Sequence, residues 1–181
     1  MNLTHPLASG TPRARQVFYN SGFAISDLAA RTFQETFGPT NTEADMAAYL
    51  ASAYSVDIQR RELEDSNLLT LVAERDGALA AYAMIRRDGP VPPCVTLPSP
   101  AEVWRFYVDR PWHGQGLAPA LMSAALDAAR ELGGRSVWLS VWEHNARAIA
   151  FYSKFAFADV GAKDFWVGED RQTDRVMSRR L

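Results

Sequence analysis

Two glycines stand where an apolar strand-like pattern gives way to a helical one, and their surroundings suggest anion-binding chemistry. The segment consists of His113, Gly114, Gln115, Gly116, Leu117 and Ala118. The first N–H groups of a helix have no partner within it, and the helix dipole places partial positive charge at the same end. Because glycine lacks a Cβ, the backbone at Gly114 and Gly116 can adopt positive φ and approach an anion closely. The segment therefore predicts a pyrophosphate-binding turn at the start of the following helix.

Ordinary turn chemistry is the competing interpretation of this segment. The lysine and hydroxyl of a P-loop are missing, and Pro119 stands where a dinucleotide fingerprint has its third glycine. What the residues support is anion binding without a metal ligand and without a nucleotide-specific side chain.

A second polar group lies on the helix expected over residues 145–155. Asn145, Ala148 and Tyr152 share one face of that helix at i, i+3 and i+7 spacing, within an otherwise apolar segment. Tyr152 could donate a proton from this face, or it could be a core aromatic whose hydroxyl finds some partner. Glu102 begins the strand expected over residues 102–108, and burial beside a cleft would raise its pKa toward a useful range. Its competing interpretation is a solvated residue at a strand end.

The overall composition is that of a soluble globular chain. It has 181 residues, 48% of them hydrophobic and 22% charged, which fits one domain over residues 13–181 after a flexible tail at 1–12. A net charge of -2 and a pI near 5.9 predict no nucleic-acid partner. The single cysteine, Cys94, excludes an intrachain disulfide and a cysteine metal cluster. Neither a signal-peptide pattern nor a long apolar run is present, so we expect a cytoplasmic protein without membrane contact.

Periodicity and turn signals place the elements that must position these residues. We expect helices over residues 24–37, 42–52, 55–64, 117–132 and 145–155. We expect strands over residues 16–19, 68–74, 78–86, 102–108, 136–141, 157–167 and 175–177. Thr42 and Asp45 form a loose capping box, and Asp76-Gly77 between two apolar runs predicts a hairpin. The proline-rich segment 88–100 predicts an irregular excursion.

Two stretches carry a family resemblance: EVWRFYV followed by WHGQGLAPALM, and WLSVWEHNARAIAFYSKFAFADVG. The first resembles the central coenzyme A motif of the GCN5-related N-acetyltransferases, and the second resembles that family's next motif at a fitting spacing. The similarity runs from about Ile25 onward. It is closest to bacterial polyamine (spermidine/spermine-type) acetyltransferases, which share TFQETF, AYLASAY and VGEDRQTDRVM. The resemblance implies an α/β (α+β) fold with a mixed, mostly antiparallel sheet of about six or seven strands, flanked by helices, with a splayed central strand pair.

The resemblance also implies acetyl-CoA as co-substrate, no metal, and transfer of an acetyl group to a primary amine. The strand residues Phe106, Tyr107 and Val108 would pair through their backbone with the pantetheine arm, and an N–H near Val108 would face the thioester oxygen. Asn145 would hold the same arm. Members of the family often form dimers, so a homodimer is a further expectation.

The same resemblance assigns the proton transfers. Tyr152 would be the general acid for the departing thiolate, and Glu102 would act on the amine directly or through water. The family usually has Gln or Arg at one of two positions that are Pro111 and His113 here. His113 could donate to a phosphate, or it could be an exposed loop histidine, so we expect weaker charge assistance at an intact site.

The acceptor is predicted to be a polyamine or a similar small amine. Its candidate contacts are Glu35, Glu43, Asp45 and Asp57 on the early helices, Glu169, Asp170 and Asp174 in the last turn, and Trp104, Trp138, Trp142 and Trp166. All of these could instead be solvated charges or core aromatics. Alternative acceptors are a protein N-terminus, an amino acid or an antibiotic amine, and a non-catalytic acyl-CoA-binding module is a third interpretation.

Overall fold

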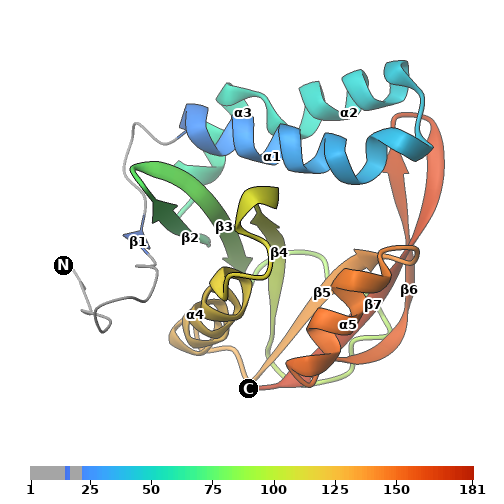
Figure 1. Cartoon of the computed structure of the whole chain (residues 1–181). Helices are drawn as coiled ribbons and strands as arrows, with labels where there is room; N and C mark the ends of the chain where they lie inside the picture. Colours follow the sequence, from blue (N-terminus) through green and yellow to red (C-terminus); the bar gives the residue numbers. More distant parts are fainter. Residues whose placement is uncertain (1–14, 17–21) are drawn as a thin grey trace.

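A mixed sheet of seven strands runs through the centre of the protein, with strand order β1-β2-β3-β4-β5-β7-β6 (Figure 1). The computed structural model describes residues 15–16 and 22–181. The strands are β1 (Arg15–Gln16), β2 (Leu68–Arg75), β3 (Ala78–Arg86), β4 (Pro100–Val108), β5 (Ser136–Trp142), β6 (Ala158–Val167) and β7 (Asp170–Arg180). Every neighbouring pair is antiparallel except β4 and β5. This is the predicted fold class, and it is confirmed; the predicted tail at 1–12 and the strand residues 17–19 lie outside the described residues.

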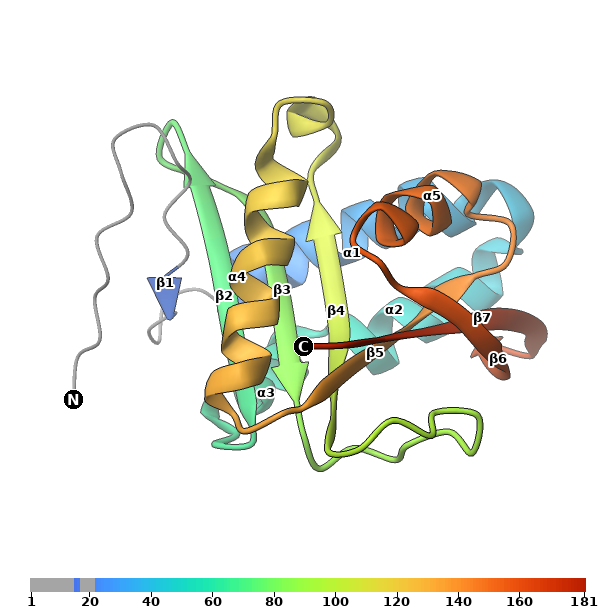
Figure 2. The same ribbon diagram turned by 90° about the horizontal axis from the view of Figure 1, so that it is seen from below.

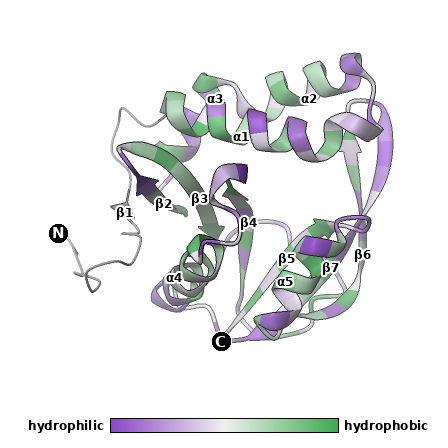
Figure 3. Cartoon of the chain, viewed as in Figure 1, coloured by the Kyte–Doolittle hydropathy of each residue, from purple (hydrophilic) through white to green (hydrophobic). Residues whose placement is uncertain are grey.

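Helices cover both faces of the sheet (Figure 1). The helices are α1 (Gly22–Phe37), α2 (Glu43–Tyr54), α3 (Val56–Glu64), α4 (Leu117–Glu131) and α5 (Ala146–Lys154). The layer of α1, α2 and α3 covers one face, which we call the upper face, and α4 and α5 cover the other, the lower face. The helices turn their hydrophobic residues mainly toward the sheet, as an amphipathic helix must (Figure 3). Among the described residues, no helix is long and apolar enough to cross a membrane.

Local signals set most of these boundaries where the sequence places them. The Thr42 hydroxyl accepts a hydrogen bond from the Asp45 N–H and caps α2. Asp76 and Gly77 both have positive φ, 51° and 79°, which is the geometry of a type I′ turn between β2 and β3. Both predictions are confirmed because each depends only on neighbouring residues.

The central strands β4 and β5 separate soon after they meet. Their register includes only Pro100, Ala101 and Glu102 on β4, and from Val103 onward the two strands are not paired (Figure 2). An opening therefore lies between them, with Glu102 at its closed end. This is the predicted splay.

A β-bulge in β4 decides which side chains face which layer. Arg105 pairs with Met84 and Val103 pairs with Ile85, so Trp104 is the extra residue. Because of the bulge, Trp104 and Arg105 both lie on the upper face, together with Tyr107. Phe106 lies on the lower face, where its ring contacts that of Tyr152.

The last strand is longer than its sequence pattern predicts. We expected a strand only over residues 175–177, with Asp174 in a polar turn; this was wrong. β7 begins at Asp170, and Asp174 pairs in register with Trp142 of β5 on one side and Lys163 of β6 on the other. Its polar residues form a regular ladder because backbone pairing, with β6 from Asp170 and also with β5 from Asp174, holds this segment instead of side-chain hydropathy.

Candidate active site

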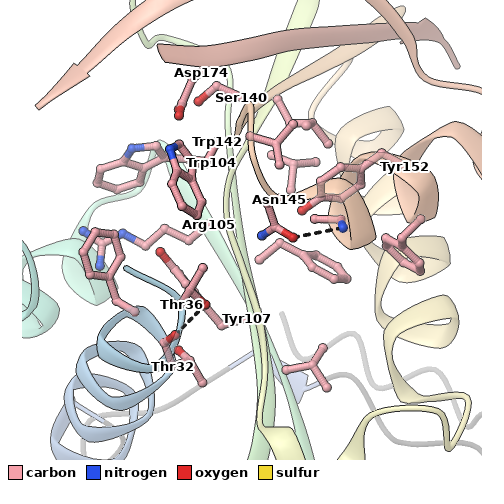
Figure 4. Close-up of a pocket in the computed structure, with 18 of the residues that line it drawn as sticks. Thr32, Thr36, Trp104, Arg105, Tyr107, Ser140, Trp142, Asn145, Tyr152 and Asp174 are labelled. Atoms are coloured by element: carbon pink, nitrogen blue, oxygen red, sulfur yellow. Dashed lines mark hydrogen bonds between the residues drawn. The ribbon is translucent and has the colours of Figure 1, made fainter. Parts of the chain in front are cut away.

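A cavity of about 840 Å³ occupies the opening between β4 and β5 and reaches both layers of helices (Figure 4). Residues of α1 and α2 line it on the upper face, and residues of α5 and of the turn before α4 line it on the lower face. The splay thus joins two chambers that a continuous sheet would keep apart. The upper chamber lies on the side of α1 and α2, and the lower chamber lies on the side of α5 and of the turn before α4.

The glycine turn leaves room for an anion at its helix. Gly114 and Gly116 have φ of 77° and 79°, and a Cβ built on either would meet nothing within 4 Å. In the described part of the chain no side chain caps the N-terminus of α4, so the N–H groups of Leu117 and Ala118 point out of the helix without a capping partner. The side chain of Gln115 folds back to donate to the Pro111 carbonyl. Open space beside unpartnered donors fits a pyrophosphate group.

His113 holds an arginine at this turn. One ring nitrogen, Nδ1, lies 2.7 Å from Nη1 of Arg147, and the other, Nε2, lies 2.9 Å from the Val108 carbonyl oxygen. A guanidinium cannot accept a hydrogen bond, so Nδ1 accepts from Arg147 and Nε2–H donates to Val108. With both nitrogens engaged, His113 has no donor left for a phosphate in this arrangement. Arg147 of α5, an exposed cavity-lining residue that the sequence analysis did not single out, brings a fixed positive charge to the turn.

The backbone of β4 turns the peptide groups of Phe106 and Val108 toward the opening, where the Val108 carbonyl already accepts from His113. The Asp109 N–H donates to the Ala80 carbonyl, which continues the β3–β4 ladder. In an antiparallel ladder, alternate residues face the partner strand, so Tyr107 faces β3 while Phe106 and Val108 face the splay. The predicted pairing with pantetheine would therefore use Phe106 and Val108. The Tyr107 hydroxyl instead lies in hydrogen-bonding contact with that of Tyr54 on the upper face.

Asn145 and Tyr152 both face the lower chamber from α5 (Figure 4). The Asn145 side-chain oxygen accepts from the Ala148 N–H at 3.1 Å and caps the helix, which leaves the amide –NH₂ group for a ligand. Tyr152 is 8% exposed and packs against Phe106 and Phe157. Burial, with a smaller contribution from the nearby Tyr107, raises the pKa of the Tyr152 phenol well above its ordinary value. Tyr152 is therefore a neutral hydroxyl, able to donate a proton, throughout the neutral pH range.

Glu102 lies at the closed end of the splay and is held by an ion pair. It is 4% exposed, and Oε2 accepts from Nε of Arg86, the neighbouring residue on β3. Burial raises the pKa of the Glu102 carboxyl, and the hydrogen bond from Arg86 lowers it by less. Glu102 is thus a buried wall residue of the cavity, and not a solvated strand end.

A buried arginine network, which the sequence analysis missed, supports the upper chamber. Arg105 donates to Glu62 and Gln59 of α3 and to the carbonyl of Ala53, at 2.7, 3.2 and 3.0 Å. Its guanidinium also stacks on Tyr54, 4.7 Å from the ring centroid. The sequence did contain a signal for this network, because Arg105 lies inside an apolar strand pattern and a buried arginine needs a charged or hydrogen-bonding partner.

The candidate acceptor residues divide sharply in the structure. Glu35 and Asp174 line the cavity, and so do Trp104 and Trp142. The other candidates do not line the cavity. Asp45 accepts hydrogen bonds from the Thr42 hydroxyl and the Glu169 N–H, and Trp138 is buried against Val95 and Val176. The remaining candidates are exposed: Glu43, Asp57, Trp166, Glu169 and Asp170.

Comparison with known proteins decides the family. The model of the Acetyltransferase (GNAT) family matches residues 25–157 of the chain. The chain belongs to this family. It is an acetyl-CoA-dependent GNAT N-acetyltransferase, and the resemblance seen in the sequence motifs is confirmed at that level.

The relatives cover this chain to different extents. An uncharacterized N-acetyltransferase of Lactobacillus delbrueckii subsp. lactis is 30% identical over 154 residues, which is 85% of this chain and 88% of that protein. The crystal structure of the PaiA N-acetyltransferase from Thermoplasma acidophilum, in complex with coenzyme A, has a TM-score of 0.74 at 17% identity, covering 93% of this chain and 98% of that one. A spermine/spermidine N(1)-acetyltransferase of Bacillus subtilis matches only 66 residues, at 35% identity, which is 35% of this chain and 43% of that protein. The polyamine resemblance is therefore partial.

Proposed function

We propose that this GNAT enzyme acetylates a primary amine of a small cationic molecule, with polyamines as the first class to test. The observation that carries the proposal is the charge of the upper chamber. Its lining includes four carboxylates, Glu35, Glu62, Glu102 and Asp174, against two cationic side chains, Arg105 and Lys163. Such a lining favours an acceptor that brings positive charge of its own.

In this proposal coenzyme A binds in the lower chamber. Bound acetyl-CoA would supply the acetyl group as a thioester. The turn at 113–118 would bind its pyrophosphate through backbone N–H groups, and Arg147 would supply the positive charge that Pro111 and His113 do not. The peptide groups of Phe106 and Val108 and the amide of Asn145 would orient the pantetheine arm.

In the lower chamber, Tyr152 is the proposed donor of the proton that the departing thiolate needs. Its hydroxyl lines the cavity from α5, and its raised pKa keeps it protonated. It would donate that proton to the departing sulfur. The sequence resemblance predicts Glu102, on the upper face of the splay, as the base, acting directly or through water, but in the structure an ion pair with Arg86 holds this carboxylate.

The test is thiol release from acetyl-CoA with a panel of amines. The panel contains spermidine, n-butylamine, a peptide with a free N-terminal alanine, and an aminoglycoside. We expect spermidine to give a higher kcat/KM than the peptide. Turnover of the peptide with no turnover of spermidine would overturn the acceptor assignment while leaving the enzyme class intact.

A further inference from the structure

Asp174 is a buried carboxylate in the wall of the upper chamber, remote in sequence from every motif of the coenzyme A site. It lies in the middle of β7, is 6% exposed and lines the cavity. It faces the same side as Ser140, and Figure 4 shows the two side chains next to each other at one end of the pocket. Isolated carboxylates are rarely buried unless they have a partner or a function.

The partners of the other buried carboxylates are known, which sets Asp174 apart. Glu102 is paired with Arg86, and Glu62 is paired with Arg105. Among the described residues, Asp174 has no ion-pair partner within 4.0 Å. Among the buried carboxylates of the chamber, Asp174 is therefore the one whose negative charge a cationic ligand could neutralise.

The aromatic surroundings point to the same position. Trp142 is the register partner of Asp174 on β5, so their side chains lie on the same face at adjacent strand positions. Trp104, by contrast, already stacks with two guanidinium groups, those of Arg86 and Arg105, at 4.3 and 4.5 Å. The Trp142 ring packs against Phe37 and His144, with ring centroids 5.2 Å apart in each pair, and no guanidinium stacks on it among the described residues. An indole ring on the same face as an unpaired carboxylate is suited to an alkylammonium group.

We propose that Asp174, and not Glu102, binds the ammonium group of the acceptor and takes its first proton. The proposal deepens the proposed function and rests on it for the class of reaction. The ammonium loses two protons when it becomes an amide. One passes to an Asp174 carboxylate oxygen before the C–N bond forms, which frees the nitrogen lone pair for attack on the thioester carbon, and it then passes to solvent. The other balances the proton that Tyr152 gives to sulfur as the C–S bond breaks.

The charged and titratable groups around Asp174 come from each neighbouring strand and from one helix. They are Lys163 on β6, Tyr107 on β4 and Tyr49 on α2, with the hydroxyl of Ser140 on β5. Burial raises the pKa of the Asp174 carboxyl, while Ser140 and Lys163 lower it by less. Since the folded pKa lies above the unfolded one, the folded state loses stability as the pH rises from the unfolded pKa through the folded pKa, and replacing the carboxylate by an amide removes this cost.

The test compares Asp174→Asn with Glu102→Gln and with a matched surface control, Asp127→Asn, which lies on α4 outside the cavity. Binding of n-butylammonium to the coenzyme A complex is measured by calorimetry, so that the readout does not depend on turnover. We expect Asp174→Asn to weaken binding about tenfold or more, and the other two variants to change it less. At pH 7 we also expect Asp174→Asn to melt at a temperature no lower than the wild type, which separates a binding role from a structural one.

The pH profile of kcat/KM for the amine substrate gives a second readout. Loss of its acidic limb in Asp174→Asn, with the limb retained in Glu102→Gln, supports the proposal; the reverse assigns the base to Glu102 and overturns it. Unchanged n-butylammonium binding in Asp174→Asn, or no binding to the wild type, also overturns it. If spermidine is not acetylated but n-butylammonium binding still requires Asp174, the polyamine assignment fails and the Asp174 site stands.

Discussion

Replacing Tyr152 by phenylalanine separates its chemistry from its packing. The ring contacts Phe106 and Phe157, with centroids 6.3 and 6.0 Å away, and phenylalanine would keep both contacts. The hydroxyl makes no hydrogen bond with the described residues in the structure, so its removal should change the free energy of unfolding by no more than about 0.5 kcal/mol.

Turnover should respond very differently from stability. A positioned general acid contributes about 10²- to 10⁴-fold, which corresponds to about 2.7–5.5 kcal/mol in the activation barrier. We therefore expect kcat of Tyr152→Phe to fall by at least about 100-fold. The dissociation constant for coenzyme A should stay within about twofold, because this hydroxyl acts on the sulfur only as the bond breaks. Since the pKa of Tyr152 is raised above 10.0, its loss of a proton should not limit the rate below about pH 10.

The assay is steady-state thiol release, with coenzyme A binding measured by calorimetry and unfolding measured in denaturant. Tyr82→Phe is the matched control, since Tyr82 is fully buried on β3 and does not line the cavity. It should keep its kcat. A Tyr152→Phe enzyme whose kcat remains within about threefold of the wild type would refute the assignment of Tyr152 as the acid.

Three further changes test the supports of the site. Arg147→Ala should weaken coenzyme A binding by about tenfold in calorimetry, with a smaller loss at high salt, because a charge-assisted contact to phosphate is removed; an unchanged dissociation constant would show that Arg147 serves only His113. Gly116→Ala should lower the melting temperature by about 2–4 °C, because φ of 79° costs an L-residue about 1 kcal/mol; an unchanged melting temperature would mean that the turn relaxes. Glu62→Ala should cost about 3–5 kcal/mol in chemical unfolding because it leaves Arg105 buried without its ion-pair partner, and a loss below about 1 kcal/mol would contradict that account.

The two chambers differ in charge, and this difference has a physical use. The lower chamber combines the positive end of α4 with Arg147, whereas the lining of the upper chamber has more carboxylates than cationic side chains. An anionic co-substrate and a cationic acceptor would each be attracted to its own side of the sheet. They would then meet at the splay, where β4 and β5 separate after Glu102.

The sequence by itself determined the features that depend on near neighbours. The turn at Asp76-Gly77, the Thr42 cap and the glycine turn before α4 all follow from local backbone preferences. The motifs at 102–108, 112–122 and 138–161 identified the family. Spacing along one helix was enough to place Asn145 and Tyr152 on a shared face, because α-helical geometry is nearly invariant.

Only the tertiary structure decided which charges are paired and which face the cavity. The ion pair between Arg86 and Glu102 and the place of Asp174 beside Trp142 depend on strand register and on a bulge at Trp104. The contact of Arg147 with His113 joins a helix to a turn 34 residues away in the chain. Pairings between distant segments are set by packing, which no local pattern records. The sequence therefore identifies the family and the local turns of this enzyme, while the charges around both chambers depend on how the fold brings distant residues together.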